Sequence, residues 1–239
     1  RVAGRAAAAG ADPRHLPGWE ALLGVAPLVA AELAQAAALR GILRVMSPPR
    51  AAPSCDHPPQ IGWGTLAVGG QLGGPRAAGV QAEGDRIWRL VGPAGGPAGW
   101  VANGGDGIPY APHELALLGL APAAGLPAVR GLRRPTRLGP GRVRALGGCE
   151  VTAAELLGPA PGPRRAPGPF RVGLVLRTRQ PLPASALARW ADGLAELAAP
   201  EVDALPDRLN FHEATGGRGA LRPVAAQPSA ACRDRTPPV

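Results

Sequence analysis

The expected fold of this chain depends on residues 84–102, GDRIWRLVGPAGGPAGWVA, in which two tryptophans lie on either side of a turn-forming segment. Trp88 and Trp100 each belong to a short run of strand-forming residues. The intervening GPAGGP is typical of a turn, because Gly and Pro favour the backbone conformations that tight turns require. The segment therefore predicts an antiparallel β-hairpin that brings the two tryptophans together, with Trp100 buried and Trp88 facing a ligand.

The composition limits the hydrophobic core that the chain can build. Its 239 residues include 35 Gly and 30 Pro, while only 3% are aromatic. Burial of apolar surface stabilises a fold by about 25 cal/mol per Å². With few large side chains, this free energy exceeds the cost of lost chain entropy only narrowly. We therefore expect a partly ordered protein in which Pro/Ala-rich segments are disordered.

The charge is strongly basic, at +9, and all 26 basic residues are arginine. Because arginine does not lose its proton, reactions that need a lysine base, a Schiff base or a phosphate-loop lysine are excluded. The densest basic run predicts weak, non-specific binding of polyanions or nucleic acid through bidentate contacts. It consists of Arg130, Arg133, Arg134 and Arg137, continued by Arg142 and Arg144. A GC-rich coding sequence also explains arginine in place of lysine, and it leaves open a translated frame without a selected function.

Residues 1–42 are expected to form a helical lead-in. The run LLGVAPLVAAELAQAAALRGIL at 22–43 is apolar, with Pro27 suited to the first turn of a helix and Gly41 to its end. The alternative is the apolar part of a signal peptide, which the proline and Glu32 disfavour. A glutamate near mid-bilayer costs about 2 to 3 kcal/mol, so we expect no membrane span.

The cysteines and histidines give no metal site. Cys55, Cys149 and Cys232 allow at most one disulfide, and no CxxC pair occurs. Cys55 lies near His57, but zinc needs three or four ligands in paired spacing. We therefore predict no metal and no other cofactor, and we interpret Cys149 as a small buried apolar residue.

The clearest secondary structure lies towards the C-terminus. FRVGLVLRT at 170–178 alternates as a strand does, and PASALARWADGLAEL at 183–197 places Leu187, Trp190, Leu194 and Leu197 on one helical face. No partner strand is visible for this unit. Further upstream, HELALLGL indicates a short helix, and VTAAELLG indicates another with Thr152 as its N-cap.

We predict an α+β protein in which a small β unit is preceded by a helix and followed by a separate strand-helix unit. The expected parts are a helical lead-in at 1–42, the β unit at 43–110, short helices and a Pro/Gly/Arg-rich linker at 111–169, the strand-helix unit at 170–223 and a disordered tail at 224–239.

The β unit resembles a known family over residues 43–103. Gly99, Trp100 and Val101 follow a strand with an aromatic residue and a glycine turn, and LRVMSPPRAAPSCDHPPQIGWGTLAVGGQ at 43–71 has the look of an earlier strand, loop and Gly-x-Leu turn. In these features the segment resembles the bacterial SH3-like domain. It departs from that pattern at 71–81, where QLGGPRAAGVQ offers few residues that favour a second strand.

The resemblance implies a small β-barrel, or at least a β-hairpin unit, that binds peptide or peptidoglycan without catalysis. It assigns Trp88, Arg86 and Tyr110 to an aromatic groove and places the protein in the cell envelope or outside the cell. Without the resemblance, a cytoplasmic location is the alternative.

An enzyme is a further alternative, centred on DRLNFHEATGGRG at 207–219. His212 is the candidate general base there, and the neighbouring glycines could place backbone N–H groups against an anion. No Gly-x-Ser-x-Gly motif accompanies it. Whether the chain is an enzyme is left open, with a binding role favoured.

Overall fold

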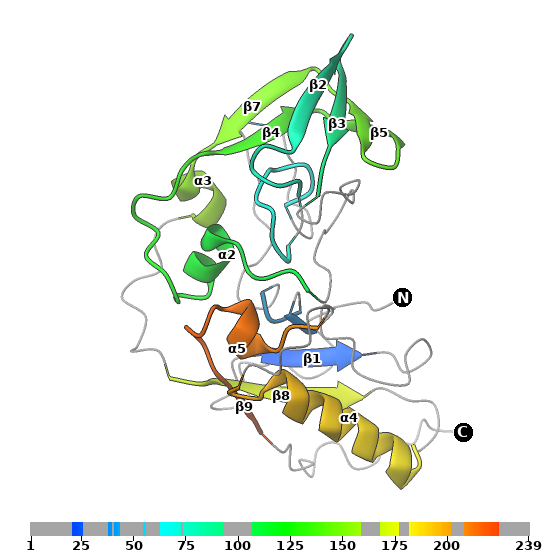
Figure 1. The fold of residues 1–239 in the computed structure, drawn as a ribbon, viewed down its shortest axis with the longest axis vertical. Coiled ribbons are helices and arrows are strands. Elements are labelled where there is room, and N and C mark those ends of the chain that lie inside the picture. The colour runs from blue at the N-terminus through cyan, green and yellow to red at the C-terminus, as the bar shows by residue number, and fades with distance from the viewer. Residues whose placement is uncertain are drawn as a thin grey trace, which may run out of the picture.

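Three sheets and a few helices make up the described part of the chain, which is a mixed α/β structure (Figure 1). This coarse feature of the α+β prediction is confirmed. The computed structural model describes residues 21–25, 38–39, 41–43, 55, 63–72, 74–92, 107–158, 168–176, 182–201 and 208–224. The predicted linker at 159–167 and the tail from residue 225 lie outside these ranges.

The largest sheet is antiparallel and four-stranded, with the order β2-β3-β6-β5. Its strands are β2 (Val80–Gly84), β3 (Ile87–Leu90), β5 (Thr136–Gly139) and β6 (Arg142–Arg144). A tight turn joins β2 to β3, and its residues Asp85 and Arg86 have φ angles of 44° and 63°. The hairpin in the structure therefore pairs the strand at Trp88 with the strand before it, whereas the sequence predicts pairing with the strand after it.

Two further strands, β4 (Val129–Arg133) and β7 (Gly147–Val151), pair antiparallel beside this sheet (Figure 1). Leu132 of β4 is buried against Leu90 of β3 and Val143 of β6. Both antiparallel sheets therefore share a small core, and the opposite face of the four-stranded sheet points away from it.

The strand β3 corrects the predicted hairpin. Its two hydrogen-bonding edges pair with β2 and β6, so Trp88 lies beside Ala82 and Val143. No edge of β3 is left for the predicted pairing with a strand at Trp100, a residue that lies outside the described ranges. Local turn signals gave no warning of this outcome, because β6 comes from a distant part of the sequence.

Residues 111–169 also differ from the expectation of short helices and a linker. The helices α2 (Pro112–Leu117) and α3 (Ala153–Leu157) are present, but β4 to β7 lie between them. These strands are short, and Gly, Pro and Arg interrupt their apolar pattern, which concealed them. By contrast, the predicted N-cap of α3 is confirmed, since the Oγ1 of Thr152 accepts a hydrogen bond from the N–H of Glu155 at 3.2 Å.

A disulfide joins Cys55 to Cys149 of β7, with 5.4 Å between the Cα atoms. A Cβ atom on Gly131 of β4 would lie 2.5 Å from Leu66 Cδ2 and 3.1 Å from Cys55 Sγ, so glycine leaves the room that this bridge occupies. Cys149 is therefore a disulfide partner and not the free apolar thiol that we predicted. The third cysteine lies outside the described residues.

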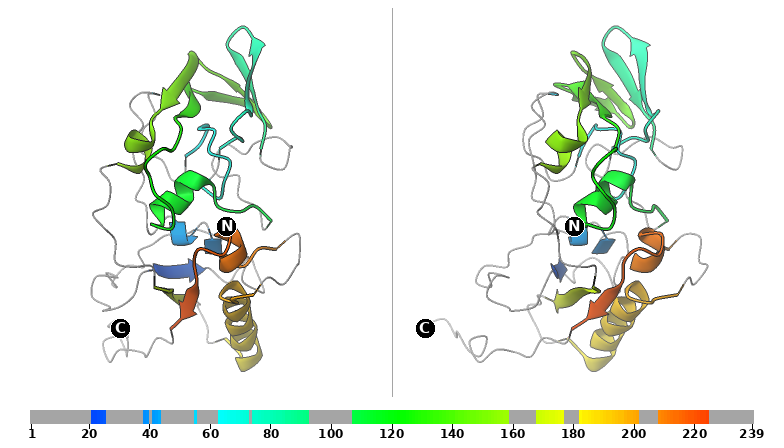
Figure 2. Two further views of the ribbon diagram at one scale, coloured as in Figure 1. Left: turned by 60° about the vertical axis from the view of Figure 1, so that its left-hand side comes forward. Right: turned by 90° about the vertical axis from the view of Figure 1, so that its left-hand side faces the viewer.

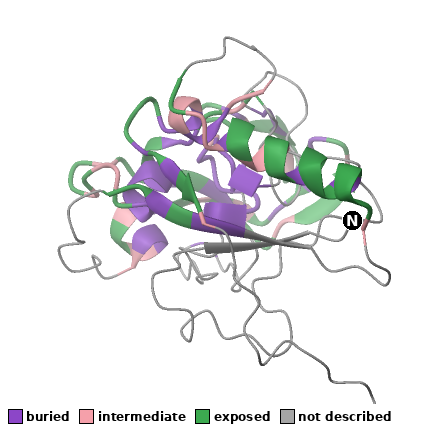
Figure 3. Ribbon diagram, turned by 90° about the horizontal axis from the view of Figure 1, so that it is seen from below, coloured by how far each residue is buried: buried purple, intermediate pink, exposed green. Residues whose placement is uncertain are grey.

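The parallel sheet contains β1 (Ala21–Val25), β8 (Phe170–Leu176) and β9 (Leu221–Pro223), in the order β1-β8-β9. The helix α4 (Ala184–Leu197) follows β8 as predicted and lies beside the sheet (Figures 1 and 2). Trp190 and Leu197 face the core, while most other positions of α4 are exposed (Figure 3). Leu187, which we placed on the buried face, is 49% exposed.

The expected helix at 22–43 is wrong at its start, because residues 22–25 lie in β1, which pairs with β8. Residues 38–39 and 41–43 are helical as expected, but Gly41 begins the second of these stretches instead of ending the helix. Ala and Leu in this run favour a helix, but pairing with the open edge of β8 overrides that local preference and selects the strand. The same pairing supplies the partner strand that the sequence did not reveal.

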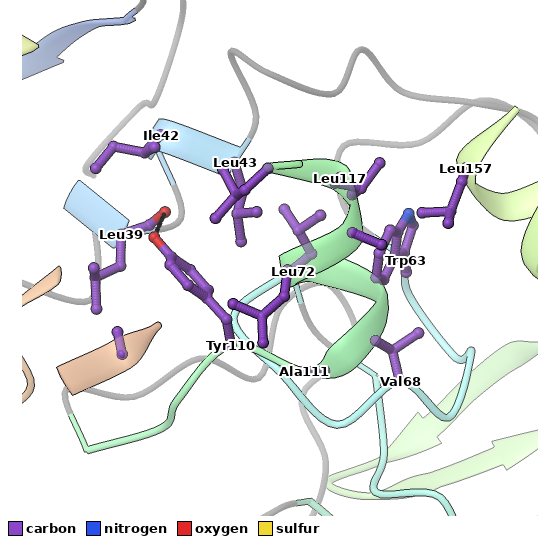
Figure 4. Packing of buried hydrophobic residues seen from close by; sticks show 14 of the residues in the cluster. Leu39, Ile42, Leu43, Trp63, Val68, Leu72, Tyr110, Ala111, Leu117 and Leu157 are labelled. Carbon is purple, nitrogen blue, oxygen red and sulfur yellow. Dashed lines mark hydrogen bonds between the residues drawn. The ribbon is translucent and has the colours of Figure 1, made fainter. Parts of the chain in front are cut away.

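One hydrophobic cluster crosses the expected domain boundaries near residues 110 and 169. Tyr110 meets Phe211 edge-on, with 5.9 Å between ring centroids, and Phe170 meets Phe211 at 5.6 Å. Phe211 opens the short helix α5 (Phe211–Ala214). Figure 4 shows Tyr110 in this cluster with leucines from the helical residues 38–39 and 41–43 and from α2. The domain bounds stay a prediction, and the residues of this core come from several of the expected domains.

Among the helices that the structure describes, none has the length and apolar character needed to cross a bilayer.

Candidate binding face

The outer face of the four-stranded sheet gathers three arginines. In β3 and β6 the side chains alternate, so that Leu90 and Val143 are buried in the core and Arg89, Arg142 and Arg144 are exposed on the other side. Arg89 lies directly opposite Arg142 in the antiparallel register, and Arg144 follows two positions along β6. We call Arg89, Arg142 and Arg144 the arginine face.

One carboxylate lies on the same face. Glu83 of β2 accepts a hydrogen bond from the Nε of Arg142 at 2.9 Å, and both side chains are substantially exposed. Neither Arg89 nor Arg144 forms an ion pair within the described parts of the chain. This face therefore carries an excess of positive charge. Like charges directly opposite each other destabilise a sheet, and a bound anion would offset that repulsion.

The predicted run of arginines does not form one patch. Arg130 lies across from Glu150 on the same side of β4 as buried Leu132, whereas Arg133 alternates to the other side. Arg137 of β5 pairs with Val143 and so lies on the opposite side of its sheet from Arg142. All three are exposed, as is Arg134, which follows β4 with a φ of 45°.

Arg89 belongs to the arginine face although it lies outside that run. The available signal was the alternation Ile-Trp-Arg-Leu, which puts Arg89 on the side opposite Leu90. Its pairing with Arg142 could not be read locally, because the two strands are distant in sequence.

The three residues assigned to an aromatic groove do not share a surface. Trp88 lies on the core side of β3 and is partly buried, and its indole N–H has no hydrogen-bond partner among the described residues. Arg86 belongs to the β2–β3 turn and is exposed. The alternation expected for a strand from 84 onwards fails because the turn interrupts it.

Tyr110 is a core residue and not a ligand-facing ring. It is 5% exposed, and its hydroxyl donates a hydrogen bond to the carbonyl oxygen of Leu39 at 2.9 Å (Figure 4). Burial, and then the charge of Glu114, raise the pKa of the phenol well above its usual value. Its hydroxyl therefore satisfies a helical carbonyl inside the cluster.

The polar segment around His212 is organised as a helix cap. Asn210 and Glu213 form reciprocal hydrogen bonds at the start of α5, each side chain accepting from the other residue's backbone N–H at 2.8 and 3.0 Å. The carbonyl oxygen of His212 accepts from Thr215 Oγ1 and from the N–H of Gly217. The carboxylate of Glu213 is therefore directed to its own helix end, and no described carboxylate hydrogen-bonds the imidazole.

The most unusual polar group is Glu114 in α2, which is fully buried. Its carboxylate accepts hydrogen bonds from the backbone N–H groups of Gln71, Leu72 and Ala111. Burial raises its pKa to about 7, although these three hydrogen bonds act in the opposite direction. Glu114 thus connects residues 71–72 to the start of α2. The sequence feature that indicates such a role is a single acidic residue in an otherwise apolar helix, because a buried acid needs hydrogen-bond partners.

The neighbouring residue His113 is also buried and contacts the segment that precedes β4. Its Nε2 lies 3.0 Å from the carbonyl oxygen of Pro127, and burial lowers the pKa of the imidazole while this contact raises it. Within the described residues, no group of His, Cys, Asp and Glu side chains has the arrangement of a metal site.

Glu114 predicts a pH-dependent stability. Because its pKa is raised from 4.5 to about 7 on folding, the folded state holds a proton that the unfolded state loses between these values, and stability falls as pH rises. Relative to Glu114→Gln, in which this group does not titrate, the free energy of unfolding should fall by about 2 to 3 kcal/mol from pH 5 to pH 8. Urea unfolding of both proteins measures this difference, and His113 is common to both. A difference that is constant with pH would contradict the prediction.

Comparison of the chain with protein-family models, curated proteins and solved structures finds no match in any of the three.

Proposed function

We propose that this protein is a non-catalytic binding protein that docks an anionic polymer on the arginine face. The observation that carries the proposal is the register of β3 and β6, which sets Arg89 beside Arg142 and leaves Arg144 on the same exposed side. Guanidinium groups bind phosphate and sulfate through paired N–H donors and remain charged at every working pH.

Rigidity of the backbone favours such a role. Pairing on both sides holds β3 and β6 in place, and their inner side chains are buried in the shared core. The ligand therefore meets charges on an ordered platform, which reduces the conformational entropy lost on binding. Because phosphate groups carry no sequence information, we expect binding through these three arginines to depend on charge and to be non-specific in sequence.

Salt dependence provides the test. With three arginines replacing counterions, affinity for a labelled mixed-sequence single-stranded oligonucleotide should fall about 20-fold between 50 and 200 mM salt. Reversal of Arg89 and Arg144 to Glu should abolish the binding seen at 50 mM salt. Fluorescence anisotropy measures both effects.

A matched control separates the arginine face from net charge. Arg189→Glu with Arg222→Glu changes the net charge by the same amount at exposed positions of α4 and β9. This variant should retain most of the affinity. Equal losses in the two double variants would reject the arginine face, and a wild-type protein without measurable binding at 50 mM salt would reject the proposed function.

Peptide or peptidoglycan binding by an SH3-like domain stays a prediction from the sequence resemblance. The observation in its favour is the pair of small antiparallel sheets around Leu90, Leu132 and Val143. Its groove would need other residues than Trp88 and Tyr110, since these two face the interior. The disulfide suits the oxidising surroundings that such a domain would meet outside the cytosol.

A further inference from the structure

Glu83 reaches across the sheet to contact the arginine face. It belongs to β2, whereas Arg142 belongs to β6, and β3 lies between these strands. Neighbouring strands are about 4.8 Å apart, so the two side chains lean towards each other over the intervening strand. Arg89, which stands opposite Arg142, lies on that strand. The Glu83 carboxylate therefore lies within the arginine face.

Only a weak contact holds this carboxylate in place. The side chains of Arg142 and Glu83 are 55% and 32% exposed, and ion pairs between exposed groups contribute about 0 to 1 kcal/mol. Its geometry, with an oxygen 2.9 Å from a guanidinium nitrogen, is also the contact that a ligand phosphate or sulfate would make. Glu83 and an anionic ligand thus compete for the same donor.

We propose that Glu83 acts as an internal competitor that makes the arginine face selective for polymeric over single anions. This inference rests on the proposed function. A single phosphate gains one contact with Arg142 by breaking an equivalent contact, so its net gain is small. A polyanion displaces the same carboxylate once and also engages Arg89 and Arg144, so its gain grows with the number of its charges.

The test compares Glu83→Gln with Glu150→Gln, an equal charge change on β7 at an exposed position away from this face. For the labelled oligonucleotide, Glu83→Gln should raise affinity about 3- to 10-fold at 50 mM salt, because the ligand no longer breaks the ion pair between Glu83 and Arg142. The salt slope should stay near that of the wild-type protein, since the same three arginines bind the ligand in both. Inorganic phosphate should displace the oligonucleotide at lower concentration from Glu83→Gln than from the wild-type protein. Glu150→Gln should change affinity less than twofold.

A double-mutant cycle with Arg142→Gln decides whether the effect acts through the observed ion pair. In the Arg142→Gln background, the gain from Glu83→Gln should disappear. Equal effects of Glu83→Gln and Glu150→Gln, or a gain that persists without Arg142, would overturn the inference while the proposed function stands. Absence of binding by both the wild-type protein and Glu83→Gln would overturn both. Urea unfolding of each variant checks that the fold is retained.

Discussion

Replacement of Glu114 by alanine is expected to destabilise the protein strongly at neutral pH. The change leaves the backbone N–H groups of Gln71, Leu72 and Ala111 without their acceptor in a buried site. Each unsatisfied buried donor costs about 1 to 3 kcal/mol, so the loss is at least about 3 kcal/mol. A domain is stable by only about 5 to 15 kcal/mol, which makes this a large fraction of the total.

Urea unfolding followed by circular dichroism measures the loss, with Glu196→Ala as the matched control. Glu196 is an exposed glutamate that forms a surface ion pair with Arg208 at 3.0 Å. Its removal should cost less than about 1 kcal/mol. Equal unfolding midpoints for Glu114→Ala and Glu196→Ala would show that the buried hydrogen bonds do not stabilise the fold.

Gly70 offers an independent route to the same contact. A Cβ atom at this position would lie 2.0 Å from the Oε2 of Glu114, so Gly70→Ala must displace the carboxylate. In Glu114→Ala that space is open, and the added methyl group should cost little. The two substitutions should therefore be strongly non-additive, whereas additive losses would place the glycine effect elsewhere.

Reduction of the Cys55–Cys149 disulfide is expected to be the second large loss. The two cysteines are separated by 94 residues in sequence, and closing a loop of about that length stabilises a protein by about 4 to 5 kcal/mol in the chain-entropy account. The replacement of both cysteines by alanine should produce a similar loss and should make the protein insensitive to reductant.

The measurement compares urea unfolding with and without dithiothreitol. Cys232→Ala serves as the control, because it removes the third cysteine and with it any exchange of partners. This variant should show the same difference between oxidised and reduced forms as the wild-type protein. Coincident unfolding curves for the oxidised and reduced wild-type protein would contradict the prediction.

Local features of this fold were predictable from sequence, and long-range ones were not. The cap at Thr152, the amphipathic α4 and the strand β8 each depend on a few neighbouring residues, and all three are present. The sequence predicts helix in place of the strand β1 because Ala and Leu at 21–23 favour a helix locally. Pairing with β8 determined its conformation, and that pairing leaves no mark near residue 21.

The same distinction applies to the candidate site. Arg142 and Arg144 were identified by charge alone, but Arg89 joins them only through the β3–β6 register, and Glu83 through the additional pairing of β2 with β3. Trp88 was assigned to the wrong side because both faces of its strand carry apolar residues. Three cysteines allow three pairings, and nothing in their spacing favours Cys55 with Cys149.

The parallel sheet has a consequence for how the chain is made. Its outer strands β1 and β9 flank β8, so residues 21–25 meet their partner only after residues 170–176 have left the ribosome. At about 5 to 20 residues per second, an early strand waits for many seconds with its backbone groups unpaired. A chaperone that binds the nascent chain during this interval would protect the unpaired strand. A chain that ends before β8 would lack the strand with which β1 pairs.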